Sequence, residues 1–470
     1  MCAASVFAVG QTLGDYSSTS GSSSGVAIPP AQGPFGGSVA PGKATGTVLP
    51  LSFKDAIDRG LQNNLGALLQ ADNTINARGQ KWSELSSLLP NLSAGVSQNA
   101  AQINLAAEGF RFSGGAFAGI PTVVGPFGFF ESRVFLSQTV FSLKAIDRTR
   151  GAVENERSAR FNYKDARDLV VLAVGNAYLQ ALAGAARVDT AEAQVQTAQA
   201  LYDKSKDQQD AGVSPAIDTL RSRVELQSRQ QQLIVARNNY AKQKLTLSRA
   251  IGLPSGQEFS LADKAPYEPL AALSVEDSLR RAYESRSDYQ AALQQVRSAQ
   301  FFRNAATAEY YPTVDIAANY GDSGITVGSS HGVFAVSGTL RIPIFQGGKV
   351  HADVLQAEAQ LKQSEQQLQN LHGQIDYDVR TALLDLNAAA DQVEVARSSV
   401  DLADQTLTQA RDRFAAGVTD NLEVIQAQES VASANESYIS GLYAHNLAKV
   451  ELARAIGYAE EGVKQYLKSK

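Results

Sequence analysis

The sequence contains a single cysteine, Cys2, among its 470 residues, so it cannot form an intramolecular disulfide. It has only 4 histidines, which lie far apart and have no carboxylate or thiol at the spacing of a metal site. They are His331, His351, His372 and His445. We therefore predict neither a metal centre nor a bound cofactor.

An excess of charge of one sign is also missing. The chain carries 42 Lys and Arg against 47 Asp and Glu, a net charge of -5, and these residues are spread along its length. No basic stripe can follow a phosphate backbone, which argues against nucleic acid as a partner.

Long apolar runs are absent too. The longest candidate, residues 169–174, is far shorter than the roughly 18 residues of a transmembrane helix. Because only helices and closed barrels satisfy backbone polar groups in lipid, we expect any membrane span of this chain to be a β-barrel.

Two short segments resemble catalytic motifs without their structural context. Gly21–Gly25 matches a nucleophile elbow, but it lies in a Ser/Gly-rich tail with no preceding strand. The segment from Gly37 to Lys43 is a near P-loop in which Ala44 replaces the magnesium-binding Ser or Thr. We therefore predict a protein that is not an enzyme, with a hydrolase using residues 21–25 as a remote alternative.

The first 50 residues are predicted to be a signal remnant followed by a flexible tail. The opening MCAASVFAVGQ resembles the end of a secretory signal without its basic start, and residues 14–50 are rich in Gly, Ser and Pro. A lipid-carrying Cys2 and an ordinary unstructured start are the alternatives.

From Leu51 onward the chain repeats itself. LSFKDAIDRGLQNN at Leu51 corresponds to LSVEDSLRRAYESR at Leu273, and AGVS around Gly212 corresponds to AGVT around Gly417. A repeat of about 200 residues indicates a duplicated unit. We expect one unit at 51–260, a second at 261–457 and a short tail at 458–470.

Each unit begins with a helix that ends before a proline, Pro90 or Pro312, and the hydrophobic period then changes to two. The expected strands are 91–105 and 129–141 in the first unit, and 313–320 and 334–344 in the second. In the last of these, Phe334, Val336, Leu340 and Ile342 form an apolar face. Four amphipathic strands cannot close a membrane barrel, so other chains are expected to cover their edges.

The rest of each unit is predicted to be a long helical hairpin. Apolar residues spaced alternately by three and four run from Val379 to Phe414, and a matching seam runs from Val174 to Tyr202. His372 falls near the start of the second seam, where a core or pore-facing histidine is expected. A helix over 349–416 would be roughly 100 Å long. Each long helix ends at a glycine, Gly212 or Gly417, and a second helix returns to about residue 251 or 456.

The chain thus resembles the TolC-like outer-membrane efflux proteins. The most specific stretches are IPIFQGG at 342–348, similar to the family's strand-to-helix junction, and RFAAGVTDNLEV at 413–424, similar to its hairpin tip. The resemblance implies a mixed α/β membrane protein that forms a homotrimer, with a twelve-stranded barrel in outer-membrane lipid and a coiled-coil tunnel in the periplasm. It also implies a passive conduit for small molecules or polypeptides, working with a periplasmic adaptor and an inner-membrane transporter.

The resemblance also implies two sets of functional residues at the hairpin tips. The residues expected to dock an adaptor are Gly212, Val213, Gly417 and Val418. The residues expected to form a periplasmic gate are Asp218, Phe414, Thr419, Glu423 and Gln426. Phe414, Thr419 and Gln426 stand where the family's type member has a Tyr, an Arg and an acidic residue, so the closed gate is expected to be looser. Glycine closes helices in any protein, and acids suit helix N-termini, so purely structural roles are the alternatives.

An elongated periplasmic coiled-coil protein with a structural role is the alternative to a channel. It would explain the heptads. It leaves the alternating strands at matching positions of both units unexplained.

Overall fold

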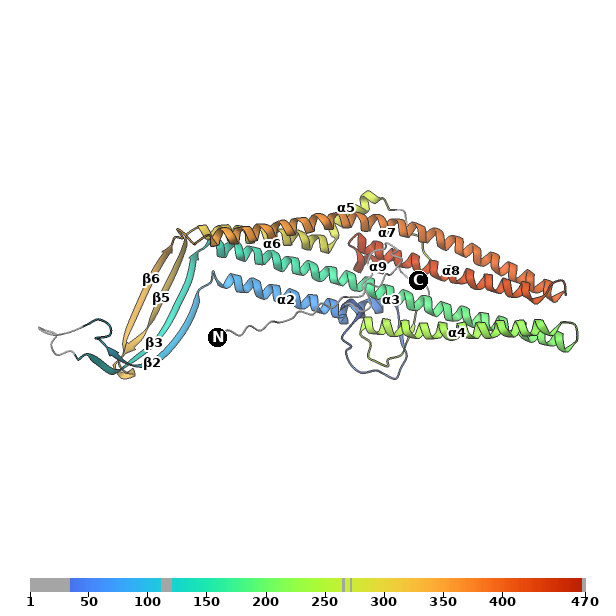
Figure 1. The fold of residues 1–470 in the computed structure, drawn as a ribbon, viewed down its shortest axis with the longest axis horizontal. Coiled ribbons are helices and arrows are strands. Elements are labelled where there is room, and N and C mark those ends of the chain that lie inside the picture. The colour runs from blue at the N-terminus through green and yellow to red at the C-terminus, as the bar shows by residue number, and fades with distance from the viewer. Residues whose placement is uncertain (1–33, 111–120, 264–266, 271–272, 467–470) are drawn as a thin grey trace, which may run out of the picture.

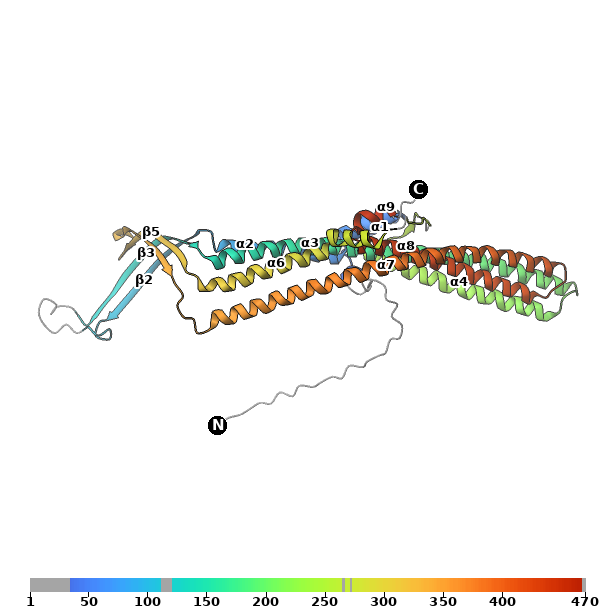
Figure 2. The ribbon, with the colours of Figure 1, turned by 90° about the horizontal axis from the view of Figure 1, so that it is seen from above.

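The computed structural model describes residues 34–110, 121–263, 267–270 and 273–466 and shows an elongated chain (Figure 1). A sheet lies at one end, two helical hairpins lie at the other, and shorter elements surround the middle (Figure 2). Cys2 and residues 21–25 lie outside the described residues.

The sheet contains β2 (Asn91–Asn104), β3 (Val123–Phe141), β5 (Thr313–Gly324) and β6 (His331–Arg341). Its order is β2-β3-β5-β6 and every neighbouring pair is antiparallel. All four strands predicted from the sequence are present. Several expected boundaries were wrong, because β3 begins at Val123, β5 continues to Gly324, and β6 runs from His331 to Arg341. Pro343 has no N–H for the ladder, so Ile342 and Ile344 lie beyond the strand.

The register gives the sheet one apolar face across all four strands. Leu92 pairs with Leu136, Leu136 with Ala318, and Ala318 with Val336. The opposite face is polar, as Arg133 Nη1 donates to Asn319 Oδ1 (3.1 Å) and Thr139 Oγ1 donates to Asp315 Oδ1 (2.8 Å). Both faces are largely exposed in the single chain, and the edge strands β2 and β6 each pair with one described strand.

The short helices of each unit are interrupted, which the sequence did not predict. The first unit has α1 (Phe53–Asn63) and α2 (Leu65–Ser86), and the second has α5 (Val275–Ser285) and α6 (Ser287–Thr307). Asn64 has ψ 131° and caps α2 by accepting from the Gly66 N–H at 2.9 Å. Arg286, at ψ 123°, is buried and paired with Asp288 and Asp378. Each extended residue starts a new helix at the same place in its unit.

The long hairpins are α3 (Leu143–Asp210) with α4 (Ala216–Ile251) and α7 (Lys349–Ala415) with α8 (Asn421–Ala455). The predicted second seam is confirmed, because most of its residues are buried and Val400 and Ala403 are half-buried. The first seam drifts near its end, where Leu201 is buried rather than Tyr202. His372 is exposed in the single chain and stacks on Tyr283, with ring centroids 4.4 Å apart. The core position was therefore wrong, and the pore-facing position stays a prediction.

The middle of the molecule contains the main core, where α1, α3, α4 and α8 meet. Ile57, Val171, Leu247, Ile251 and Val450 are among its fully buried residues. The tail predicted up to residue 50 was wrong from residue 34 onward. There β1 (Leu49–Leu51) pairs in parallel with β4 (Phe259–Leu261). The Asn64 side chain also donates to the Phe35 carbonyl at 2.7 Å, which ties this segment to the break between α1 and α2. At the other end of the chain, α9 (Ala459–Tyr466) follows α8.

One described helix, α3, is long and apolar enough by composition to cross a membrane, contrary to the expectation from apolar runs. The stretch concerned is 72% buried inside the protein. It includes Val170, Val171 and Leu172, which belong to the middle core. This burial identifies α3 as a core helix.

Candidate functional site

The two hairpin tips have the same backbone geometry. Gly212 and Gly417 both have φ 72°, in the left-handed region that favours glycine. The Val213 N–H donates to the Gln208 carbonyl at 2.9 Å, and the Val418 N–H donates to the Arg413 carbonyl at 3.0 Å. This 6→1 bond closes each helix in a Schellman motif. Val213 and Val418 are left 76% and 69% exposed. The turns of both hairpins lie at the end of the molecule farthest from the sheet (Figure 1).

Asp218 is buried rather than displayed at the surface. Its carboxylate accepts from Ser214 Oγ at 2.9 Å and lies 3.7 Å from Arg221 Nη1. Arg221 also lies 3.6 Å from Asp420, at the start of the second return helix. This small ion-pair network therefore joins α4 to the second tip.

A buried polar contact holds the two hairpins together beside Asp218. The Asn421 Nδ2 group donates to the Asp218 carbonyl at 2.7 Å and to Ser222 Oγ at 3.0 Å. Ser222 Oγ is also 2.8 Å from Ser205 Oγ on α3. Asn421 and Ser222 are fully buried, so these bonds are shielded from water. We call Asn421, Ser222 and Ser205 the inter-hairpin latch.

The other predicted gate residues lie on the second hairpin. Glu423 is about half-exposed and pairs with Arg413 at 3.3 Å. Gln426 is exposed and Thr419 is partly exposed. Asp218 and Glu423 therefore have different surroundings within one chain, the first enclosed between hairpins and the second accessible.

Phe414 is buried in a small apolar cluster at the tips. It packs with Leu201 of α3, with Leu407 of its own helix and with Val424 of α8. Lys204 Nζ lies 5.3 Å from the centre of its ring. The ring thus contributes apolar and cation–π contacts between the hairpins.

Sequence reasoning missed Arg221, Asn421 and Arg413. Asn421 stands at the first turn of α8 and Arg413 stands one turn before the second tip. Both residues lie in the hairpin-tip stretch 413–424, but nothing in the sequence indicates their partners. Only the packing of α4 against α8 shows that Asn421 bonds across hairpins.

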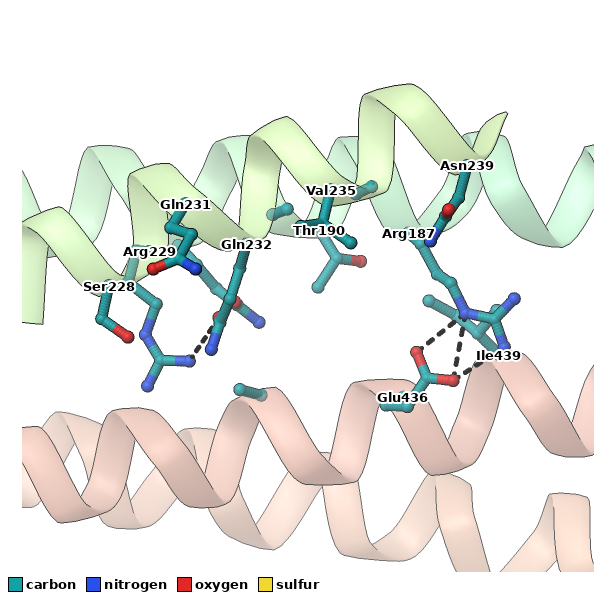
Figure 3. A pocket seen from close by; sticks show the side chains of 14 residues that line it. Arg187, Thr190, Ser228, Arg229, Gln231, Gln232, Val235, Asn239, Glu436 and Ile439 are labelled. Carbon is teal, nitrogen blue, oxygen red and sulfur yellow. Dashed lines mark hydrogen bonds and ion pairs between the residues drawn. The ribbon is translucent and has the colours of Figure 1, made fainter. Parts of the chain in front are cut away.

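Farther from the tips, a polar groove of about 620 Å³ lies between α3, α4 and α8 (Figure 3). At one end, Arg187 binds Glu436 through two nitrogens, with Nη2 2.7 Å and Nε 2.9 Å from carboxylate oxygens. This bidentate pair lowers the pKa of the Glu436 carboxyl. Arg229 is buried on α4 and paired with Glu225 on the same helix.

A cluster of charges in the middle region joins the two units. Arg167 of α3 holds Glu460 of α9 by two bonds of 2.7 and 3.0 Å, and Arg454 lies 3.5 Å from Asp165. Burial raises the pKa of Asp168 to about 7, and the neighbouring carboxylate of Asp165 adds to this shift.

Among the described residues no group of three or more His, Cys, Asp or Glu side chains could hold a metal ion. The polar groups at the tips are ion pairs and hydrogen bonds that connect helices. Asn421 and Asp420 on the second hairpin contact α4 of the first through them.

Comparisons with known proteins agree with this architecture. The sequence profile of the family described as "Outer membrane efflux protein" matches residues 86–253 and 278–458. The chain is 23% identical to the alkaline protease secretion protein AprF of Pseudomonas aeruginosa over 342 residues, which is 71% of this chain and 70% of that protein. It is 21% identical to the outer membrane protein TolC of Escherichia coli over 355 residues, 69% of each chain.

Among solved structures, the CmeC outer membrane channel of Campylobacter jejuni is similar with a TM-score of 0.76 at 17% identity. The similarity covers 94% of this chain and 96% of that one. It extends over the sheet, the middle region and both hairpins.

Proposed function

This chain belongs to the outer membrane efflux protein family, and on that premise we propose that its hairpin tips dock a periplasmic adaptor and carry the gate of the channel. The chain is an outer-membrane efflux channel and not an enzyme. In this family the channel is trimeric and works with the other components of an export system. The resemblance seen in the sequence is therefore confirmed, and so is the predicted class of fold.

The observation that carries the docking proposal is the matched pair of exposed valines. Val213 and Val418 each follow a glycine with the same φ. The two repeated units therefore expose a valine side chain at equivalent positions of their hairpin tips. A partner that covers both valines would bury them in the apolar centre of an interface. A helical adaptor hairpin offers grooves between its own side chains that can receive them.

Site-specific cross-linking in cells tests the docking proposal. Val213→Asp combined with Val418→Asp should weaken cross-links to the adaptor while leaving the trimer intact. Val48→Asp is the matched control, because Val48 is 55% exposed but lies beside β1 in the middle region. Cross-linking that is equally strong in the tip variant and the control would leave the glycines and valines with a structural role only.

We propose that the closed state rests on the inter-hairpin latch and on Phe414. Within the latch, Asn421 donates both hydrogen bonds from the second hairpin to the first. Position 419 is a threonine, which has no guanidinium to add charge-assisted bonds there. Breaking one buried hydrogen bond costs about 1 kcal/mol, and leaving its partners unpaired costs more. Asn421→Ala should therefore favour the open state at every tip of the trimer.

Single-channel recording of Asn421→Ala measures this directly as a longer open time and a higher mean conductance. Asn435→Ala is the control, since the Asn435 amide donates to the Val431 carbonyl of its own helix. Wild-type gating in Asn421→Ala, in a correctly assembled trimer, would refute the latch.

For the exported substrate and the partner transporter, we propose only a general class. One of the relatives named above is an alkaline protease secretion protein, and the other is an outer membrane protein. We propose that this chain is the passive exit for small molecules or polypeptides delivered by an inner-membrane transporter. Deletion of the chain should then give the same export defect as deletion of that transporter, and different defects would argue for separate pathways.

A further inference from the structure

A groove beside the hairpin tips combines two cations with an apolar wall. Its wider part, about 520 Å³, lies between α3, α7 and α8, and a narrower part of about 270 Å³ continues from it toward α4. The two parts share Ala193, Thr197, Arg411 and Gln428. We call the whole cavity the tip groove.

The charges in the wider part are of one sign. Lys204 of α3 and Arg411 of α7 line it, and no carboxylate is among its lining residues. Both cationic side chains are exposed to the groove and to solvent, and Lys204 makes its contact with the ring of Phe414. A negatively charged head group placed here would meet two positive charges from opposite hairpins.

The remaining wall of the wider part is apolar. Leu201, Phe414 and Val424 form it. These residues are buried against one another and present one side to the cavity. A ligand that fits must therefore carry an apolar body as well as a negative charge.

Gln428 gives a second and independent sign of a ligand. It is 6% exposed and lines both parts of the groove. Neither its amide nitrogen nor its amide oxygen has a hydrogen-bond partner among the described residues. A buried amide without partners costs free energy, so an acceptor or donor that reaches it from the groove is favoured.

The narrower part is less suited to the anionic end. Asp404 lines it on α7, and Arg229 there is already bound to Glu225 and Gln232. The head group of the ligand therefore belongs in the wider part, within reach of Lys204, Arg411 and Gln428.

We propose that the tip groove binds an amphiphilic organic anion, with its carboxylate or sulfonate between Lys204 and Arg411 and its apolar body against Leu201, Phe414 and Val424. Such a ligand would bridge α3 to α7 and α8. Its influence on opening depends on the gate proposed above, whereas its binding does not.

Binding is tested with naphthalene-2-sulfonate as the probe, added to the trimer in lipid nanodiscs, and with empty nanodiscs subtracted. Titration calorimetry should show saturable binding that weakens as salt is raised, because exposed charges are screened. The neutral analogue 2-naphthol should not compete at equal concentration. Lys204→Gln or Arg411→Gln should each weaken binding about three- to fivefold. Arg223→Gln, which removes an exposed cation of α4 outside the groove, should leave it unchanged.

A second measurement locates the probe. In a Cys2→Ser background, a cysteine introduced by Thr197→Cys faces the groove, and the probe should slow its reaction with a thiol reagent. Binding that is indifferent to both cations, or absence of protection at Thr197→Cys, would overturn the proposal. If the probe protects Thr197→Cys but channel gating does not change, the binding site is supported and the proposed gate at the hairpin tips is contradicted.

Discussion

At the residue scale, the left-handed glycines show what a single side chain can change at the tips. Gly417→Ala should cost about 1 kcal/mol locally, since alanine at φ 72° is strained. Amide hydrogen exchange at residues 413–420 should therefore become faster. Gly373→Ala is the matched control, because Gly373 lies inside α7 with nothing within 4 Å of its would-be Cβ. It should be neutral or stabilising by up to about 1 kcal/mol. Equal effects of the two changes would contradict the assigned turn.

Glu423 is the accessible acid of the predicted gate, and three copies of it are expected near the narrow end of a trimer. Glu423→Gln should lower the preference for cations and the block by multivalent cations, more strongly at low salt. Arg413→Gln should have the opposite effect, because Arg413 lies 3.3 Å from Glu423 and offsets its charge. Reversal potentials in asymmetric salt measure both, and identical shifts in the two variants would be incompatible with an acidic ring.

The charge cluster around Asp168 predicts a pH effect on stability. Burial raises the pKa of Asp168 to about 7, above its usual value of 3.8, so the folded protein holds a proton that the unfolded chain releases. This contribution is fully present below about pH 4 and is lost as the pH rises through 7.

Asp168→Asn should therefore raise the melting temperature of the trimer at pH 8 by about 2 °C and leave it nearly unchanged at pH 4. Melting curves at the two pH values test this. A stabilisation of the same size at both would mean that the effect does not come from ionisation.

Sequence reasoning could place the site residues on the chain but not their partners. The sequence shows the same Gly-Val pair at 212–213 and at 417–418, which predicts a turn at each position. The backbone confirms both turns, because Gly212 and Gly417 have positive φ. Asp218 looked like an acid near a helix N-terminus, and its burial depends on α8, which lies 200 residues away in the sequence. The enclosure of such a group is a property of tertiary packing, on which local patterns carry no information.

At the scale of elements, strand period and heptad spacing were sufficient to predict the four strands and two hairpins. Alternation fixed which residues share a face, and the observed register keeps Leu136, Ala318 and Val336 in line. The breaks at Asn64 and Arg286 were missed because both residues sit within uninterrupted helical patterns. Tertiary partners hold them extended, namely the Phe35 carbonyl for Asn64 and the Asp378 carboxylate for Arg286.

The faces of the sheet give a prediction about the membrane. Val336 lies on the apolar face and Ser337 on the polar one. Val336→Arg should cost about 2 to 4 kcal/mol if it lies near the middle of the bilayer, whereas Ser337→Arg should cost little in a water-filled interior. Refolding equilibria in lipid vesicles measure both, and similar costs would contradict the assigned faces.

At the scale of the whole molecule, the edge strands β2 and β6 require the neighbouring chains of the trimer. Each has one partner strand among the described residues, and an open edge in lipid leaves N–H and C=O groups unpaired. The single chain therefore leaves two open edges, which neighbouring chains are expected to pair.

Gating should also be testable on the whole assembly. Ser222→Cys and Asn421→Cys place thiols where the wild-type side chains are 3.0 Å apart, on different hairpins. In a Cys2→Ser background, a mild thiol oxidant should join the two cysteines in a disulfide and hold the channel closed, and reduction should restore conductance. Either single variant treated in the same way is the control. Closure in a single variant would show that the effect does not come from a disulfide between the hairpins.

Because α7 continues unbroken past the middle core, a small rotation of this helix at the core produces a larger displacement at the second hairpin tip. From the core at Val379 to the turn at Gly417, α7 continues as one helix without an internal hinge. At 1.5 Å per residue this arm is about 55 Å long. A tilt of only about 5° at the core then moves the tip by roughly 5 Å, about the rise of one helical turn. Small repacking around Ile375 and Val379 would thus appear at the tips as a movement wide enough to separate Asn421 from Ser222.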